Sequence, residues 1–337
     1  MSFHLAVALD APSFSADYWA GLARTADEAR LDFVTFEDTF GPPADGPARP
    51  DAVLLAARIA PLTSHIGLVP VATTTHTEPF HLSTALATLD FVSGGRAGWQ
   101  ARVSGSPADA ALLGRRPVPS VEDLFDEAAD AVEVVRRLWD SWDDDAVIKD
   151  VATGRFIDRD RLHYIDFGGR FFAVKGPSIV PRPPQGQPVV AALAHNPLAY
   201  EFAARSADLV FVTPPDVAAV TSIIGDVRAA EAAVRRVGPP LKVFADLVVF
   251  LSRAASIQSD AAVFAGTPAE LAELLSQWHS AGVDGFRLRP GELPRDLESI
   301  TRELVPLLPF RPAPGPLRER LGLGPAVNRY SKEARVA

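Results

Sequence analysis

Two neighbouring carboxylates, Glu37 and Asp38, stand in the short apolar run FVTFEDT and are the first residues whose types suggest chemistry. A pair of carboxylates can serve as the acid and the base of a glycosidase. Successive side chains of a strand point to opposite faces, so only one of these two can reach a common substrate. The pair therefore indicates a single polar side chain at a site and argues against a glycosidase centre.

His76 is a second candidate, because it follows the threonines of IGLVPVATTT and precedes Glu78-Pro79, which is a typical helix start. An imidazole titrates near neutral pH and could act as a base or position a substrate. A hydrogen-bonded histidine at a helix start, without a chemical role, explains the residue equally well. We expect no metal site, since the chain has no cysteine and its seven histidines show no metal-binding spacing.

The glycine pair of LDFVSGGRAGWQ (89–100) does not form a phosphate loop. It matches neither common nucleotide-binding glycine pattern and precedes a strand, where a phosphate loop would follow one. We interpret Gly94-Gly95 as a helix C-terminal cap and turn. No GxSxG elbow surrounds a serine, so no serine nucleophile is predicted.

These residues belong to a regular alternation of short β-branched runs and longer amphipathic segments, which is typical of parallel strands joined by helices. Strands are expected at 4–10, 33–39, 66–75, 96–104, 188–194, 209–215, 241–252 and 285–291. Helices are expected at 17–31, 50–63, 78–93, 121–142, 196–207, 216–238, 267–282 and 293–308. Eight such pairs favour an α/β fold of the TIM (β/α)8 barrel type over the alternative, an open doubly wound sheet. In a barrel the carboxyl ends of the strands would gather their polar residues at one mouth.

Residues 143–187 interrupt this alternation, and we interpret them as an insertion after the fourth helix, with short strands around Thr153-Gly154 and Gly168-Gly169. Residues 1–310 are predicted to form one barrel domain. The proline- and glycine-rich residues 311–337 are expected to be an extended tail.

Composition excludes several classes of partner. The net charge of −9 would repel nucleic acid, and no run of basic residues offsets it. No apolar run is long enough to cross a bilayer, and the first residues do not resemble a leader peptide. We therefore expect a cytoplasmic protein that binds neither nucleic acid nor membranes.

The stretch TEPFHLSTALATLDFVSGGRAGWQ (77–100) resembles the signature of the flavin-dependent, bacterial-luciferase-like monooxygenases. The similarity is to the branch with nitrilotriacetate, desulfurisation and pristinamycin-type monooxygenases, and residues 33–40, 132–190, 201–211 and 265–308 agree with it in order. It implies a TIM barrel with insertions and an FMN-linked oxidoreductase, a monooxygenase that uses reduced flavin and dioxygen on a small hydrophobic substrate. It also implies a separate NADH:flavin reductase as partner and a homo-oligomer.

By position, the resemblance places Asp38, Thr75 and Gln100 against the flavin, with Thr74 beside them. Gln100 stands where the family has asparagine, and Ser104 ends a segment in which the family's valine-threonine-serine has become Arg102-Val103-Ser104. We take His76 and Gln100 as the candidate catalytic residues.

The family's phosphate-binding Gly-Ser-Ser reads Ala194-His195-Asn196 here and is followed by Pro197. Proline has no N–H to offer a phosphate, so His195, if protonated, and the Asn196 amide are the remaining candidates for that contact. Phe125 replaces a family tyrosine. These departures describe a divergent, shortened member. They leave two alternatives open: a non-catalytic barrel that has lost the flavin and serves as partner subunit or small-molecule binder, and a deazaflavin-dependent oxidoreductase.

Overall fold

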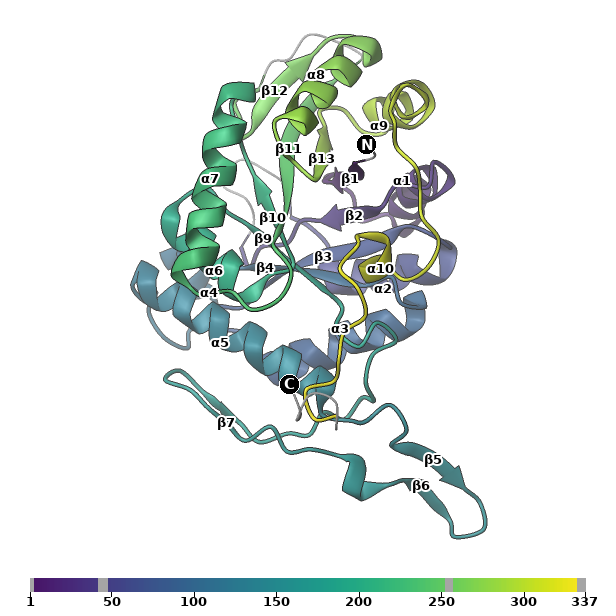
Figure 1. Ribbon diagram of the computed structural model, residues 1–337, viewed down its shortest axis with the longest axis vertical. Coiled ribbons are helices and arrows are strands. Elements are labelled where there is room, and N and C mark those ends of the chain that lie inside the picture. Colours follow the sequence, from purple (N-terminus) through teal and green to yellow (C-terminus); the bar gives the residue numbers. More distant parts are fainter. Residues whose placement is uncertain (1–2, 42–47, 252–256, 332–337) are drawn as a thin grey trace.

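Eight parallel strands close into a barrel in the computed structural model, which describes residues 3–41, 48–251 and 257–331 (Figure 1). The order around the barrel is β1, β2, β3, β4, β9, β10, β11 and β13, and β13 pairs with β1 to close it. Their bounds are His4–Leu9, Phe33–Phe36, Gly67–Thr73, Gly98–Arg102, Val189–Leu193, Leu209–Val212, Lys242–Phe250 and Gly285–Pro290. The predicted TIM barrel is confirmed, and each predicted strand contains an observed one. Residue 252, the end of one predicted strand, lies outside the described residues.

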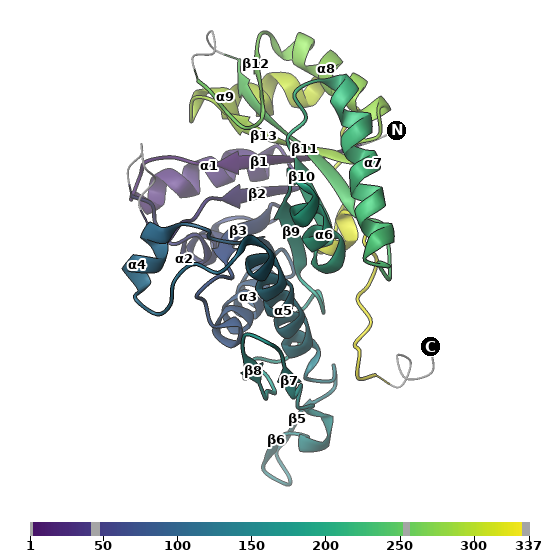
Figure 2. The ribbon, with the colours of Figure 1, turned by 90° about the vertical axis from the view of Figure 1, so that its left-hand side faces the viewer.

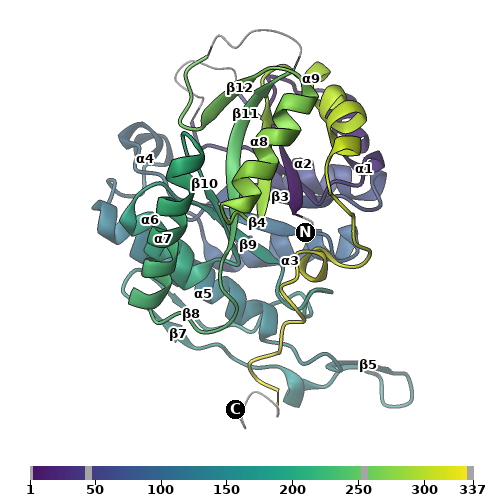
Figure 3. The ribbon, with the colours of Figure 1, turned by 45° about the horizontal axis from the view of Figure 1, so that its top comes forward.

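Helices surround this barrel (Figures 1 and 3). They are α1 (Ala16–Glu28), α2 (Ala52–Ile59), α3 (Pro79–Ser93), α5 (Val121–Asp140), α6 (Pro197–Ser206), α7 (Val217–Ala233), α8 (Pro268–Ser280) and α9 (Arg295–Ser299). Local sequence fixes several of their ends. Thr267 and Glu270 form a capping box at α8, and Gly94 caps α3 with φ 67°, a conformation that glycine adopts without strain. Neither α4 (Pro107–Leu113), which follows β4, nor β12 (Ala262–Ala265) was predicted, and β12 pairs with the C-terminal half of β11, beyond the residues that pair with β10.

The inside of the barrel is filled by aromatic and aliphatic side chains, because its strands are buried on both faces. Phe33, Phe211 and Phe244 come from three strands and contact one another, with ring centroids 5.6 to 6.2 Å apart. This interior gives the polar residues at the strand ends a rigid base.

The predicted insertion is two hairpins that extend beyond α5, away from the barrel (Figure 2). One pairs β5 (Val147–Asp150) with β6 (Arg155–Ile157), and the other pairs β7 (Phe167–Gly168) with β8 (Ala173–Val174). The short strands lie around Thr153-Gly154 and Gly168-Gly169, where the sequence predicted them.

The C-terminal segment differs from the extended tail that we predicted. Figure 3 follows it, in yellow, from α9 to a one-turn helix, α10 (Leu317–Arg320), and on toward the chain end. Leu317 and Leu321 are fully buried in the same cluster as Phe33 and Phe211. The physical reason is that a barrel leaves apolar side chains uncovered at its base, and the leucines of LRERLGL cover them. Residues 332–337 of the predicted tail lie outside the described residues.

This segment also buries Arg320 against His65 at the base, where Arg320 Nη1 lies 2.8 Å from His65 Nε2. Burial and the guanidinium groups of Arg320 and Arg30 lower the pKa of His65 to about 4. The unfolded chain binds a proton at His65 near pH 6.5 and the folded chain only near pH 4, so stability falls as pH drops through that window.

His65→Gln removes this titrating group, and its amide oxygen can still accept from Arg320. We expect the melting temperature of this variant to fall less between pH 6.5 and 4 than the melting temperature of the wild type. Calorimetry across this range tests the prediction, with the exposed His81→Gln as control, and equal pH profiles for all three proteins would contradict it.

Within the described ranges, no helix has the length and apolar character needed to span a bilayer.

Candidate functional site

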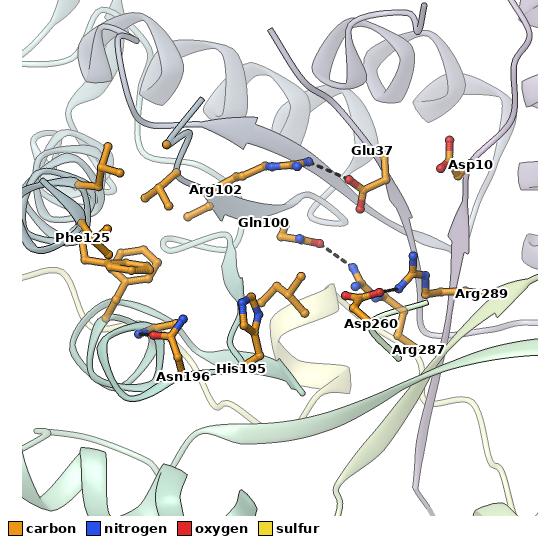
Figure 4. A pocket seen from close by; sticks show the side chains of 18 of the residues that line it. Asp10, Glu37, Gln100, Arg102, Phe125, His195, Asn196, Asp260, Arg287 and Arg289 are labelled. Carbon is orange, nitrogen blue, oxygen red and sulfur yellow. Dashed lines mark hydrogen bonds and ion pairs between the residues drawn. The ribbon is translucent and has the colours of Figure 1, made fainter. Parts of the chain in front are cut away.

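A cavity of about 560 Å³ opens at the carboxyl ends of the barrel strands. Its lining side chains come from strand ends on opposite sides of the barrel and from α5 and α6 (Figure 4). The volume is in the range that binds small molecules and cofactors. In TIM barrels this end carries the active site, so the cavity is the candidate functional site.

One wall of the cavity is apolar. Leu124 and Phe125 from α5 face Phe202 from α6, and the Phe125 and Phe202 rings lie 5.8 Å apart between centroids. Leu193, at the end of β9, extends this wall. A flat aromatic ring or an apolar substrate group can pack here.

The opposite rim carries three ion pairs. Arg49 Nη2 lies 2.9 Å from Asp10 Oδ2, and Arg289 Nη1 lies 2.9 Å from Asp260 Oδ1. Arg102 Nη1 lies 3.0 Å from Glu37 Oε2 and also donates to the Asp38 carbonyl. Figure 4 shows Glu37 and Arg289 on one side of Gln100 and Phe125 on the other, with Arg102 reaching across toward Glu37. These partly exposed pairs contribute little to stability, but they leave guanidinium N–H groups beside the cavity.

The floor of the cavity holds Gln100 and Arg287, which point toward each other (Figure 4). Arg287 Nη1 donates to Gln100 Oε1 over 2.7 Å. Its Nε donates to Asp246 Oδ1 over 2.7 Å and its Nη2 to the other oxygen, so the pair is bidentate. The guanidinium also lies over the Phe211 ring, 3.8 Å from the centroid. Asp246 is 0% exposed and Arg287 is 2% exposed, which makes this a fully buried ion pair.

The sequence placed Arg287 among the polar residues at the strand ends, but only Gln100 of these three was predicted as a site residue, and Asp246 was not considered. A signal for Asp246 and Arg287 was present, because each is a charged residue inside an apolar strand, in LKVFADLVVF and GFRLRPG. A charge buried in a strand interior requires a partner of opposite sign. Two such strands are therefore expected to lie side by side, as β11 and β13 do, with Asp246 directly opposite Arg287.

Three of the predicted cofactor-binding residues line the cavity, namely Gln100, His195 and Asn196. The other four lie beside it in a network that connects the loops after β2, β3 and β4. The Asp38 carboxylate accepts from the backbone N–H groups of Thr39 and Ala52, at the start of α2. Thr74 Oγ1 donates to the Arg102 carbonyl over 3.0 Å, Thr75 Oγ1 accepts from Ser104 N over 3.0 Å, and Ser104 Oγ donates to Asp109 over 2.7 Å. The structure therefore places Asp38, Thr74, Thr75 and Ser104 as residues that shape the mouth.

His76, predicted as a candidate catalytic residue, is buried and does not line the cavity. Its backbone φ is 64°, which is strained for a residue with a side chain, and its carbonyl accepts from Arg115. Neither ring nitrogen has a hydrogen-bond partner among the described residues. Burial and the charge of Arg116 lower the pKa of His76, so its imidazole is neutral near pH 7. The structure thus brings Gln100, and not His76, to the cavity.

The amino end of α6 meets the cavity at His195 and Asn196. Asn196 is the N-cap, its side-chain oxygen accepts from Ala199 N over 3.0 Å, and Pro197 occupies the first helical position. One N–H that could bind a phosphate is therefore already paired, and another is absent. The predicted start of this helix at residue 196 is confirmed, and this helix end offers little to an anion.

No group of histidine, cysteine and carboxylate side chains that could hold a metal occurs in the part of the chain that the structure describes.

The comparison with known families agrees with this geometry. Residues 1–262 match the family model of the luciferase-like monooxygenases. The chain belongs to this family. Its members use reduced flavin and dioxygen, and they include nitrilotriacetate, dibenzothiophene-sulfone and pristinamycin-forming enzymes. The predicted family and the enzymatic role are confirmed.

Individual relatives of this luciferase-like chain match over most of its length. The N-acetyl-S-(2-succino)cysteine monooxygenase of Bacillus subtilis (strain 168) is 28% identical over 96% of this chain and 94% of its own. One of the polypeptides of the pristinamycin IIA synthase of Streptomyces pristinaespiralis is 30% identical over 91% of this chain and 89% of its own. The crystal structure of a long-chain alkane monooxygenase has a TM-score of 0.86 at 21% identity, with 96% of each chain covered, which shows the shared fold.

Proposed function

We propose that this chain is the oxygenase of a two-component system, which takes reduced FMN from a separate NADH:flavin reductase and uses it with dioxygen on a small organic substrate. The observation that carries the proposal is the cavity at the barrel mouth, with an apolar wall on α5 and α6 and fixed donors at Gln100 and Arg287. Reduced flavin, when bound, supplies the electrons that activate dioxygen. The chain's own residues bind and orient the ring and exclude water from it.

The cavity fits the ring of a flavin better than its phosphate. Phe125, Phe202 and Leu193 offer an apolar face for a flat ring, and Gln100 and Arg287 offer donors for its polar edge. At the amino end of α6, Pro197 has no N–H and the N–H of Ala199 is already paired, so this helix end offers a phosphate fewer donors than usual. We propose that side chains at the rim, His195 and Arg102 among them, take over part of that contact.

Restoring an N–H at α6 should strengthen the binding of the phosphate. We expect Pro197→Ser to bind FMN about tenfold more tightly than the wild type, since one charge-assisted hydrogen bond contributes roughly 1.5–3 kcal/mol. Riboflavin lacks the phosphate, so its Kd should not change. Calorimetric titration with both flavins measures the effect, and Pro268→Ser at the same position of α8 is the matched control. An equal gain for FMN and riboflavin would show that the phosphate does not lie at α6.

The substrate is proposed to be small and mainly apolar, and to pack beside the flavin against the rest of the α5 wall, at Val121 and Leu124. The charged rim allows it one polar group, which Arg49, Arg102 or Arg289 could contact. Relatives that share the fold act on molecules as different as a long-chain alkane and nitrilotriacetate. The charged rim and the apolar wall together fit a molecule that has an apolar body and one polar group.

We also propose that the protein is a homo-oligomer. Phe91 and Val92, near the end of α3, are large, exposed apolar side chains next to each other, and Pro61, just after α2, lines the same shallow groove. Exposed apolar surface of this kind marks interaction sites. Size-exclusion chromatography with light scattering measures the assembly, and a monomer at all accessible concentrations would contradict it.

Anaerobic titration of the purified chain with oxidised and chemically reduced FMN tests the proposed activity, followed by oxygen-consumption assays with candidate substrates. We expect micromolar binding of the reduced form and substrate-dependent oxygen uptake. The altered α6 end favours a second candidate, a barrel that no longer binds flavin and acts as partner subunit or small-molecule binder. Absence of binding in both redox states would favour it, whereas binding of a deazaflavin alone would indicate a deazaflavin-dependent oxidoreductase.

A further inference from the structure

The side-chain amide of Gln100 is held in one orientation at the cavity floor. Arginine has only hydrogen-bond donors, so the atom of Gln100 that faces Arg287 Nη1 at 2.7 Å must be the amide oxygen. The amide NH2 group therefore points away from Arg287. Gln100 lines the cavity, and it reaches the floor from β4, on the other side of the barrel from β13.

Arg287 is itself fixed. Asp246 holds two of its nitrogens and the Phe211 ring lies under its guanidinium, so the side chain has one conformation available. A buried bidentate pair with an aromatic ring beneath it is rigid, because every alternative would leave a charge unpaired in the barrel interior. The positive charge of Arg287 and the NH2 group of Gln100 thus share the floor of one cavity.

We infer that Asp246 and Arg287 are positioning residues that lock the Gln100 amide as a hydrogen-bond donor, so that the cavity floor binds the reduced, anionic form of a flavin in preference to the oxidised form. This inference rests on the proposed function. A fixed N–H donor, with the positive end of the Asp246–Arg287 pair behind it, stabilises negative charge on a bound ring, and polarity near the ring nitrogens is a main way in which proteins tune flavins. The same floor binds neutral oxidised flavin less tightly.

Binding of the two redox states separates this role from a merely structural one. In Gln100→Met the donor is removed while side-chain length and the Asp246–Arg287 pair are retained. We expect its Kd for reduced FMN to rise about tenfold or more, and its Kd for oxidised FMN to change by less than about threefold. A tenfold rise in the Kd of reduced FMN relative to the Kd of oxidised FMN lowers the midpoint potential of the bound flavin by about 30 mV. Gln100→Glu, which has only acceptor atoms at neutral pH, should shift the ratio further in the same direction.

Arg287→Lys tests the positioning role, because it keeps the charge and loses the fork that holds Asp246 and Gln100 together. We expect Arg287→Lys to lower the ratio of the Kd for oxidised FMN to the Kd for reduced FMN by nearly as much as Gln100→Met does. Arg136→Met is the matched control, since it removes another arginine with a buried aspartate partner, Asp208, that does not line the cavity. Circular dichroism and thermal melting confirm that each variant is folded.

The outcomes are distinguishable. Tight binding of reduced FMN by the wild type with unchanged Kd ratios in the Gln100 variants would overturn this inference and leave the proposed function standing. An equal loss of affinity for both redox states would also overturn it, because it would indicate packing alone. No binding of either state by the wild type would overturn the proposed function and, with it, the inference.

Discussion

Asp246→Ala should lower the free energy of unfolding by about 3–5 kcal/mol, one of the two largest effects that we expect from a single substitution in this chain. The substitution leaves the Arg287 guanidinium buried in the barrel interior, with Gln100 Oε1 as its remaining polar contact among the described residues. Removing one partner of a buried pair costs more than the pair contributes, because the remaining charge is desolvated without compensation. Urea denaturation followed by circular dichroism measures the change.

A rim pair provides the matched control for this prediction. Asp260→Ala removes the carboxylate that lies 2.9 Å from Arg289, but both of those side chains are partly exposed to solvent. Its expected cost is below about 1 kcal/mol. The double variant Asp246→Ala with Arg287→Leu should recover much of the lost stability, since no unpaired charge remains. Equal destabilisation by Asp246→Ala and Asp260→Ala would show that the pair is solvated and would contradict the burial argument.

The periodicity of the sequence was sufficient to predict the barrel. Parallel strands buried on both faces read as short apolar runs, and the helices between them have local stop and start signals that do not depend on distant residues. Gly94 ends α3, and Asn196 with Pro197 begins α6, as expected. Arg96, just before β4, donates at the base of the barrel to the carbonyls of Ala60, Thr63, Ile66 and Ser93.

The site was predicted only in part, for a physical reason. Gln100, His195 and Asn196 stand at strand ends, where a barrel gathers its polar residues, and the family resemblance assigned them to the flavin. Whether a side chain then turns into the cavity depends on loop geometry, and the loop after β2 turns the Asp38 carboxylate to the start of α2. Asp246 and Arg287 lie 41 positions apart in the sequence and meet only because β11 and β13 are neighbours in the closed barrel.

The C-terminal segment shows the limit of composition as a guide. Prolines and glycines indicate irregular backbone, and α10 is indeed a single turn. Composition does not reveal that the leucines between them are buried, because that depends on an apolar surface formed by strands far away in the sequence. Leu317 contacts that surface so closely that a Cβ on Gly67 would lie 2.8 Å from its side chain.

Leu317→Ala should therefore lower the free energy of unfolding by about 2–5 kcal/mol, the range for removing a fully buried leucine from a rigid core. Thermal and urea denaturation measure the loss. Leu307→Ala, at a half-exposed leucine of the preceding segment, is the control and should cost less than about 1 kcal/mol. Equal effects of the two substitutions would show that the segment does not close the base in solution.

The consequence of Leu317→Ala should extend to the cavity at the opposite end of the barrel. Leu317 belongs to the cluster that contains Phe211, and the Arg287 guanidinium lies on the Phe211 ring. A void in that cluster removes packing from beneath the Asp246–Arg287 pair, because the interior relaxes only partly around a deleted side chain. We therefore expect Leu317→Ala to weaken the preference for reduced over oxidised FMN by a few-fold, at a temperature where the variant is fully folded. Leu307→Ala should leave that preference unchanged, so the same pair of variants tests whether the closed base supports the donor geometry at the mouth.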